Sequence, residues 1–195
     1  VSITGFPITS TLQCLGCYPG DYSQFLGMHV MHGTFEANNA MHDCDLMINI
    51  GARFDDRITG MVSKFSPNSK KIHIDIDPSS INKIVKVDVA IVGDAQSIMS
   101  TMLEIIKKKY PGFKNSNKEK ISDWWKQIEK WREKKSLSFK EDKKTILPQY
   151  AVQRLYELTK NQDTFITTEV GQHQMWAAQH YKFNKPNRWM TSGGL

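Results

Sequence analysis

Two short segments near the end of the sequence have the residue types of a site for a phosphate-bearing ligand. An apolar run over residues 165–168 predicts a strand, and the polar stretch 171–179 predicts the start of a helix. The first N–H groups of a helix point outward at such a junction and favour phosphate. A second predicted strand ends in the stretch 192–194, whose glycines let backbone approach a ligand closely. Because this site is half built at Leu195, we expect the sequence to be a fragment of a larger protein.

Polar residues also follow three predicted strands in the first half of the sequence. The stretches 51–57, 75–78 and 93–94 combine glycine or proline with aspartate, and the first of them adds two arginines. Ligands of open α/β sheets bind outside the carboxyl ends of strands, where arginine suits phosphate and aspartate suits ribose hydroxyls. A nucleotide is one interpretation, although the sequence has no G-x-G-x-x-G motif. The other is a set of surface turns with Arg–Asp pairs.

The stretch 26–34 is predicted to be a loop bounded by glycine, and it contains two methionines and two histidines. A metal site is one interpretation, but no carboxylate or thiolate lies there at ligand spacing. Soft methionine and flat histidine side chains instead suit packing against a planar ring such as isoalloxazine.

Cys14 and Cys17 form a C-x-x-C pair, and Cys44 stands alone. The spacing is that of thioredoxin-like proteins, but that motif opens a helix, whereas the residues around this pair predict a turn. A zinc ribbon would need a second pair. We expect small apolar side chains in a reducing compartment, with a redox or metal role as the alternative.

The elements that must position these groups alternate between strand and helix, which predicts a doubly wound, parallel, Rossmann-like α/β sheet. The expected strands are residues 46–50, 71–76, 87–92 and 165–168, and the expected helices are residues 34–43, 95–109 and 149–160. Composition divides the chain into an α/β domain over 1–109, a basic helical connector over 110–147 and the first part of a second α/β domain over 148–195.

The formal charge of +6 is concentrated in the connector. Residues 107–144 hold 14 Lys and Arg against 6 Asp and Glu, a net charge of +8, so the remainder carries −2. Trp124, Ile128 and Trp131 in this segment share one face of a helix. A basic patch with aromatics could bind nucleic acid, but we expect a solvated helix whose tryptophans face a domain, and no nucleic acid. No apolar run is long enough to span a bilayer, so we expect no membrane partner and a cytoplasmic protein.

Four stretches of the sequence together resemble acetohydroxyacid synthase, also called acetolactate synthase, a family whose large catalytic subunit depends on thiamine diphosphate. These stretches are residues 27–34, 51–57, 73–78 and 171–176. The resemblance runs essentially from end to end. It implies an enzyme with an N-terminal pyrimidine-binding domain, a central FAD-binding domain and a C-terminal diphosphate-binding domain, all α/β. This chain resembles the central domain, the connector and the beginning of the third domain.

The resemblance also implies which residues bind cofactors. FAD contacts from the central domain would be Thr11, Leu12, His29, Val30, Met31, His32, Gly51, Ala52, Arg53, Phe54, Asp55, Asp56, Arg57, Asp75, Ile76, Asp94 and Ala95. Those from the third domain would be Gln174, Met175, Gly193 and Gly194. Gln172 and His173 would touch thiamine diphosphate. Met31, Asp56 and Arg57 would also line the channel to the active site.

Two residues depart from the family pattern. Val30 and Cys14 each stand where the family usually has glycine. Valine at a position of close flavin approach would be strained if its φ were positive, because its Cβ and branched side chain crowd the backbone there.

The implied reaction decarboxylates pyruvate and adds the two-carbon unit to a second 2-keto acid. The product is 2-acetolactate, or 2-aceto-2-hydroxybutyrate from 2-ketobutyrate, in branched-chain (isoleucine and valine) amino acid biosynthesis. FAD would be structural because the net reaction is not a redox one. The resemblance further implies a homodimer or homotetramer with a small regulatory subunit. The cofactor-activating glutamate and the Mg²⁺ ligands would lie outside residues 1–195, so we expect no catalytic residue, no metal ligand and no activity from these residues alone.

Other functions remain open at this point. Glyoxylate carboligase and pyruvate oxidase are alternatives among thiamine-diphosphate enzymes, although the stretches 53–57 and 171–174 favour the synthase. An alternative of another class is a nucleotide-binding module without catalysis.

Overall fold

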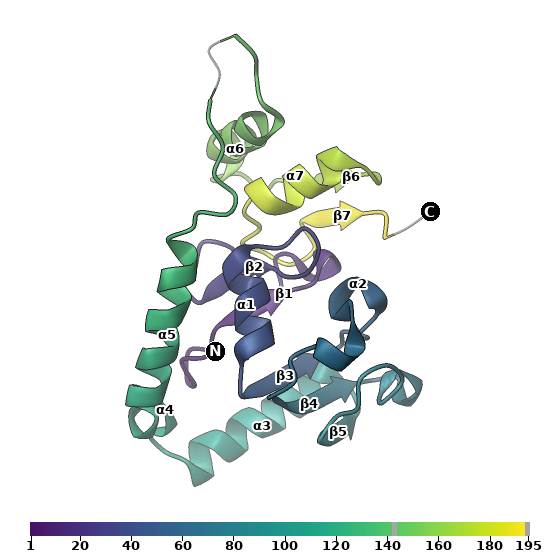
Figure 1. Ribbon diagram of the computed structural model, residues 1–195, viewed down its shortest axis with the longest axis vertical. Helices are drawn as coiled ribbons and strands as arrows, with labels where there is room; N and C mark the ends of the chain where they lie inside the picture. The colour runs from purple at the N-terminus through teal and green to yellow at the C-terminus, as the bar shows by residue number, and fades with distance from the viewer. Residues whose placement is uncertain (142–143, 194–195) are drawn as a thin grey trace. The chain divides into compact units, whose positions relative to one another are not determined.

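The computed structural model of the chain describes residues 1–141 and 144–193 (Figure 1). These residues form two compact units, and each is described by itself. The first unit consists of Val1–Phe6 and Asn38–Ile128, and the second consists of Pro7–Ala37 and Glu129–Leu195. The predicted flavin contact at Gly194 lies outside the described residues.

A parallel three-stranded sheet forms the centre of the first unit, in the order β3-β4-β5 (Figure 1). The strands are β3 (Leu46–Ile50), β4 (Lys70–Asp75) and β5 (Val89–Val92). Ile50 pairs with Ile74, and Asp75 pairs with Val92, so the three strands end at one edge of the sheet. The prediction of a parallel α/β sheet is confirmed, and each of these strands begins and ends within two residues of the predicted bounds.

Helices alternate with these strands along the sequence. They are α1 (Phe35–Asp43), α2 (Asp56–Thr59), η2 (Val62–Lys64), η3 (Pro78–Ser80), α3 (Ala95–Lys109) and α4 (Phe113–Ser116). α3 packs against β4. Phe54, Phe65 and Val85 form a hydrophobic core in this unit, with Phe54 and Phe65 in an edge-to-face contact at 5.7 Å.

The second unit holds two pairs of short parallel strands. β1 (Ile8–Ser10) pairs with β2 (Phe25–Met28), and β6 (Ile166–Thr168) pairs with β7 (Trp189–Thr191). The helices of this unit include η1 (Leu12–Cys14), α6 (Pro148–Thr159) and α7 (Gln172–His180). The expectation of a loop over residues 26–34 is wrong in its first part, because Phe25–Met28 is a strand.

One hydrophobic core holds the elements of the second unit together. It contains Leu15, Met28, Ala177, Ala178, Tyr181, Phe183 and Trp189. The rings of Phe183 and Trp189 lie 5.1 Å apart, and those of Tyr181 and Phe183 lie 4.9 Å apart. Leu15 and Met28 come from the N-terminal part of the chain, so this core joins segments that are far apart in sequence.

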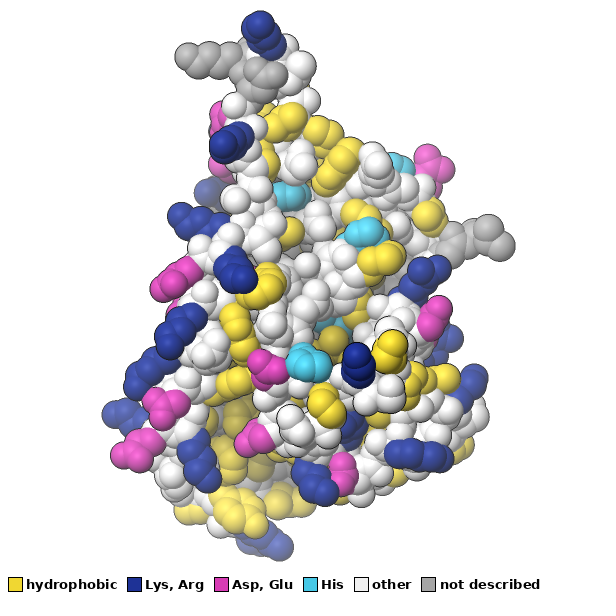
Figure 2. Space-filling model, in the orientation of Figure 1, with side chains coloured by type: hydrophobic (Ala, Val, Ile, Leu, Met, Phe, Trp, Pro, Cys, Tyr) yellow, Lys and Arg dark blue, Asp and Glu magenta, His cyan; other side chains and the backbone are white. Residues whose placement is uncertain are grey.

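The basic segment contains α5 (Lys118–Arg132). Ile128 is fully buried, and Trp124 and Trp131 on the same predicted face are half-buried. Lys126 pairs with Asp123 at 2.8 Å on the exposed side, and Figure 2 shows lysine and arginine interleaved with acidic side chains along this helix. The predicted solvated helix with an apolar face is confirmed. No helix within residues 1–141 and 144–193 is both long and apolar enough to cross a membrane.

Candidate cofactor-binding site

The three polar clusters predicted in the first unit lie next to one another at the carboxyl edge of the sheet. Gly51 directly follows β3, and its N–H donates to the carbonyl oxygen of Ile74 in β4 at 2.8 Å. Gly93 directly follows β5, and its N–H donates to the carbonyl oxygen of Asp75 at 3.0 Å. Each strand end is therefore fixed to its neighbour. The edge presents glycine, arginine and aspartate together, which is the residue set that suits a nucleotide.

The loop after β3 is shaped by a glycine and by an asparagine. Gly51 has a φ of +67°, which only glycine adopts readily, and the space where a Cβ would stand is open. The side-chain amide of Asn49 donates to the carbonyl oxygen of Ala52 at 2.5 Å, which holds the next turn of the loop. The loop backbone is consequently accessible beside Gly51, as close approach by a ligand requires.

Side chains of this loop divide into exposed and buried ones. Arg53 is three-quarters exposed, and its guanidinium lies 3.6 Å from the carboxylate of Asp55. Asp56 and Arg57 in the first turn of α2 are also exposed. Phe54 has a φ of +54°, and its buried side chain belongs to the core of the unit. Only the backbone of Phe54 is available to a cofactor.

Asp75 ends β4 with a carboxylate that accepts one backbone hydrogen bond and lies beside an imidazole. Its Oδ1 accepts from the N–H of Asp77 at 2.9 Å, and its Oδ2 lies 3.5 Å from Nε2 of His73. The carboxylate is buried, whereas the next side chain, Ile76, is 72% exposed. A fixed carboxylate at the end of a strand can accept hydrogen bonds from a ligand without losing conformational freedom on binding.

Asp94 has a different role, because its carboxylate caps α3. It accepts from the N–H of Ser97 at 2.9 Å and from the Ser97 hydroxyl at 3.0 Å. These two hydrogen bonds hold the pKa of Asp94 below its usual value, and the bond from the Ser97 backbone has the larger effect. Since the side chain is engaged, Asp94 and Ala95 could offer a ligand their backbone at the start of α3.

In the second unit, two predicted flavin segments follow neighbouring parallel strands. Thr11 and Leu12 come directly after β1, and His29–His32 come directly after β2. His29 is buried, whereas Met31 is 67% exposed. Val30 has a φ of +77°, so the structure confirms that valine occupies a glycine-like conformation here.

The predicted cofactor residues of the third domain gather around the start of α7 and the end of β7. Gln172 and His173 are exposed in the first turn of α7. Gln174 is buried, and its amide donates to Oγ1 of Thr191 at 2.7 Å and to the carbonyl oxygen of Ser192 at 2.8 Å. Gln174 therefore fixes the end of β7 to α7. Met175, next along the helix, is half-buried.

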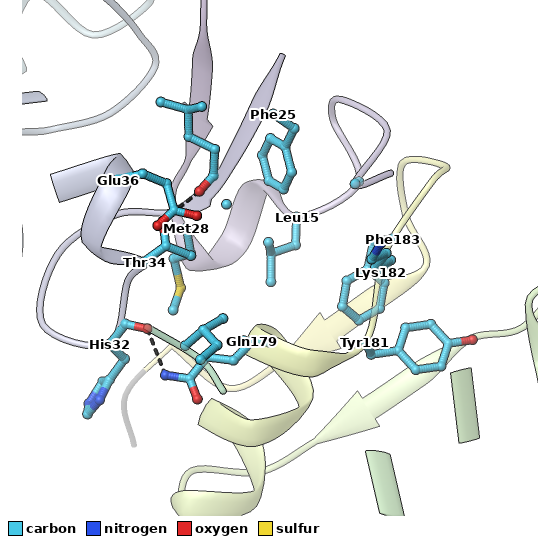
Figure 3. Close-up of a pocket in the computed structure, with 16 residues that line it drawn as sticks. Leu15, Phe25, Met28, His32, Thr34, Glu36, Gln179, Tyr181, Lys182 and Phe183 are labelled. Carbon is cyan, nitrogen blue, oxygen red and sulfur yellow. Dashed lines mark hydrogen bonds between the residues drawn. The ribbon is translucent and has the colours of Figure 1, made fainter. Parts of the chain in front are cut away.

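Three glutamine and histidine side chains were missed by the sequence reasoning. Gln13 lies beside Gly193, where an added Cβ would stand 3.0 Å from its Nε2. Gln179 donates to the carbonyl oxygen of His32 at 2.8 Å, as Figure 3 shows. His73 supports Asp75. The only sequence signal was the His73–Asp75 spacing of two, which puts both side chains on one face of a strand.

A cavity of about 230 Å³ also lies in the second unit. Leu15, Phe25, Met28 and Phe183 contribute apolar side chains to its wall (Figure 3). Glu36, Tyr181 and Lys182 also line it. Nothing in the sequence reasoning predicted this cavity.

The cysteines differ from the expectation. Cys14 and Cys17 are joined in a disulfide, so the prediction that they are separate apolar side chains is wrong. The reason is the turn between them, which brings their Cα atoms to 5.4 Å. Cys44 is a free cysteine. Among residues 1–141 and 144–193, no group of three or more His, Cys, Asp or Glu side chains is arranged to hold a metal ion.

Comparison with known proteins covers both units. Residues 1–102 match "Thiamine pyrophosphate enzyme, central domain", and residues 169–195 match "Thiamine pyrophosphate enzyme, C-terminal TPP binding domain". The acetolactate synthase isozyme 3 large subunit of Escherichia coli (strain K12) is 44% identical over 195 residues, which are 100% of this chain and 33% of that protein.

Two further relatives give the same pattern. The acetolactate synthase large subunit of Haemophilus influenzae is 47% identical over 188 residues, which are 96% of this chain and 32% of that protein. The chloroplastic acetolactate synthase 1 of Nicotiana tabacum is 43% identical over 195 residues, which are 100% of this chain and 28% of that protein. The chain thus spans about a third of the length of the curated relatives it matches.

Proposed function

Because its first 102 of 195 residues match the central domain of thiamine pyrophosphate enzymes, the chain belongs to that family, and we propose that it is part of an acetolactate synthase large subunit. The observation that carries this proposal is the 44–47% identity to bacterial acetolactate synthase large subunits over nearly the whole chain. The similarity includes the segments at the strand ends of both units, where ligands of α/β proteins bind.

The proposed reaction joins two 2-keto acids. Pyruvate loses CO₂, and its two-carbon unit is added to a second pyruvate or to 2-ketobutyrate, giving 2-acetolactate or 2-aceto-2-hydroxybutyrate. Thiamine diphosphate supplies the carbanion chemistry when it is bound. The residues of this chain bind and orient cofactors. Met31, Asp56 and Arg57 are exposed and are proposed to line the substrate channel.

FAD is the proposed ligand of the strand ends in the first unit. The open backbone beside Gly51 suits close approach, the exposed guanidinium of Arg53 suits a phosphate, and the fixed carboxylate of Asp75 suits a ribose hydroxyl. We further propose domain limits of 1–109, 110–147 and 148–195. The strand ends that are proposed to bind FAD belong to the domain over 1–109. FAD would be structural there, because the reaction has no net oxidation.

Thiamine diphosphate is the proposed ligand of the start of α7. The side chains of Gln172 and His173 are exposed at the first turn, and the first N–H groups of a helix have no partner inside the helix. The ring of His173 lies against Gly171, because a Cβ at Gly171 would stand 2.8 Å from two atoms of the imidazole. The position therefore suits glycine.

Other parts of the proposal rest on the relatives. Their name as large subunits suggests a small regulatory subunit, and we propose a homodimer or homotetramer of large subunits in the cytoplasm. Mg²⁺ would be held with the diphosphate by residues outside 1–195. The expectation that residues 1–195 alone have no activity stays a prediction.

The test uses the complete polypeptide that contains residues 1–195. With pyruvate, thiamine diphosphate, Mg²⁺ and FAD, it should release CO₂ and form acetolactate, and omission of thiamine diphosphate should abolish the product. Glyoxylate offered alone distinguishes a carboligase, and consumption of O₂ with formation of acetate distinguishes a pyruvate oxidase. Acetolactate absent under all of these conditions would overturn the proposal and favour a nucleotide-binding module.

A further inference from the structure

The disulfide of the second unit closes a turn whose backbone conformation is set by its dihedral angles and a backbone hydrogen bond. Leu15 has φ −60° and ψ 127°, Gly16 has φ +91°, and the N–H of Cys17 donates to the carbonyl oxygen of Cys14 at 3.0 Å. These values are those of a type II turn, in which the third residue is normally glycine. Cys14 and Cys17 occupy its first and last positions, so the turn alone brings the two side chains together.

Packing on the other side of the turn fixes it further. Leu15 is buried in the core of the unit, and a Cβ at Gly16 would collide with the carbonyl group of Lys185. Downstream, the N–H of Gly20 donates to the carbonyl oxygen of Phe183 at 3.0 Å and to the side-chain oxygen of Asn184 at 2.9 Å. The turn consequently does not depend on the sulfur–sulfur bond, and opening that bond leaves the two thiols facing each other.

The two cysteines also differ in access. Cys17 is exposed, whereas Cys14 is half-buried at the end of η1. Thiol–disulfide exchange needs one sulfur that an external reagent can reach and a second sulfur close enough to displace it. The pair has this arrangement, with Cys17 as the accessible sulfur and Cys14 as the resolving one.

We propose that Cys14 and Cys17 form a redox-active pair, a modification site that a low-molecular-weight disulfide oxidises and a low-molecular-weight thiol reduces. The Cys17 thiolate attacks one sulfur of the small disulfide, forms a mixed disulfide and releases one small thiol. The Cys14 thiolate then attacks Sγ of Cys17 and releases the second small thiol. Two electrons pass from the pair to the small disulfide, and the two protons of the cysteine thiols end on the two released thiols.

The third cysteine provides a matched control within the chain. Sγ of Cys44 donates to the carbonyl oxygen of Met41 at 3.3 Å and lies 3.6 Å from the hydroxyl of Ser66. Burial raises the pKa of the Cys44 thiol, which keeps it protonated and slow to react. Cys44 should therefore stay reduced while the pair changes state.

The experiment equilibrates the complete polypeptide in a series of glutathione buffers from fully reduced to fully oxidised. The samples are quenched with acid, alkylated with a maleimide and digested, and the peptide that carries both residues of the pair is followed by mass spectrometry. In the reduced buffers the peptide should carry two alkylated cysteines. In the oxidised buffers it should carry no alkyl group, and its mass should be two hydrogen masses below that of the peptide with two free thiols. Dithiothreitol added to the folded protein should restore both alkylation sites, and Cys44 should remain alkylated throughout.

Serine variants identify the role of each sulfur. Cys14→Ser should accumulate glutathione on Cys17, because the resolving thiol is missing, and Cys17→Ser should take up glutathione more slowly. A pair that stays alkylated in every buffer would overturn the proposal. So would a disulfide that dithiothreitol opens only after denaturation, or a Cys44 that reacts as readily as Cys17. The wild-type series decides the question even if a serine variant fails to fold.

Discussion

His73 and Asp75 lie on the same face of β4, with Nε2 of the imidazole 3.5 Å from Oδ2 of the carboxylate. The imidazole is fully buried, and neither of its ring nitrogens has a hydrogen-bond partner among the described residues. The same ring meets Phe54 edge to face at 5.1 Å. One buried side chain thus contacts both the carboxylate at the end of β4 and the loop that follows β3. These are two of the segments proposed to hold FAD.

Asp75→Asn should weaken FAD binding by about ten- to a hundredfold in the complete polypeptide. The amide removes the charge from a hydrogen bond in a buried site, which costs roughly 1.5–3 kcal/mol. Titration of the apoprotein with FAD, followed by flavin fluorescence, measures the change. Asp77→Asn is the matched control, because Asp77 is an exposed carboxylate that binds Ser79 locally. Equal losses in both variants would show that the fixed position of Asp75 has no special role.

Arg53→Ala should produce a similar loss of FAD affinity if the guanidinium meets a phosphate. The affinity for thiamine diphosphate, titrated by activity, should change much less, because Gln172 and His173 belong to another part of the chain. Unchanged FAD binding in both Arg53→Ala and Asp75→Asn would mean that these strand ends are ordinary surface turns.

His73→Phe tests whether the imidazole positions the carboxylate. Phenylalanine keeps a flat ring against Phe54 but removes the ring nitrogen that lies 3.5 Å from Asp75, so FAD affinity should fall by no more than about two- to tenfold, because the lost polar contact is weaker than a hydrogen bond. Combining this change with Asp75→Asn should add little further loss, since both act through the same carboxylate. Fully additive losses would contradict the positioning role.

Val30→Gly should give a more stable protein than Val30→Ala, by about 1 kcal/mol. Both changes remove the two Cγ methyl groups of valine, and they differ in the Cβ that strains a residue at φ +77°. Glycine is ordinarily the less stabilising of the two, because it loses more backbone entropy on folding. The reversed order, measured by denaturant unfolding of the two variants, is therefore specific to the strain. A Val30→Ala variant that is more stable than Val30→Gly would contradict the predicted backbone strain at this residue.

The sequence allowed the long elements to be predicted because their signals are local. β3 and α3 have the predicted bounds, since an apolar run ends at Gly51 and since Asp94 is a strong N-cap before an amphipathic stretch. β1 and β2 were missed. They have three and four residues, and Gly27 interrupts the second, so pairing between the strands defines them and not local propensity.

The candidate site was predictable in its strand ends but not in its supports. Gly51, Asp75 and Gly93 are visible in the sequence because they terminate apolar runs. The bonds from Gln174 to Thr191 and from Gln179 to the carbonyl oxygen of His32 join residues that only the fold brings together. No single-sequence pattern encodes such contacts.

Ile128→Ala tests the apolar face of the basic helix. The side chain is fully buried, and its truncation should lower the free energy of unfolding by about 2–5 kcal/mol. Lys126→Ala is the control on the exposed side of α5 and should change it by no more than about 0.5 kcal/mol. Thermal or denaturant unfolding of both variants measures the difference. A larger loss in the lysine variant would indicate that the charges of α5 hold a partner.

His180 should make the stability of the protein depend on pH. The side chain is buried in α7, 3.5 Å from the amide of Gln153 and edge-on to Phe139, and burial lowers the pKa of the imidazole. The unfolded chain, with a pKa near 6.5 for an unperturbed imidazole, takes up a proton before the folded one. The stabilisation is therefore complete above about pH 6.5 and is lost as the pH falls through the lower folded-state pKa.

His180→Gln removes this titration and keeps a polar group beside Gln153. The free energies of unfolding of wild type and variant, measured between pH 7.5 and 5, should show a steeper fall for the wild type below about pH 6.5. Above that pH the two curves should run parallel, because neither side chain changes its protonation there. Parallel curves over the whole range would mean that the imidazole is as free to take up a proton in the folded protein as in the unfolded chain.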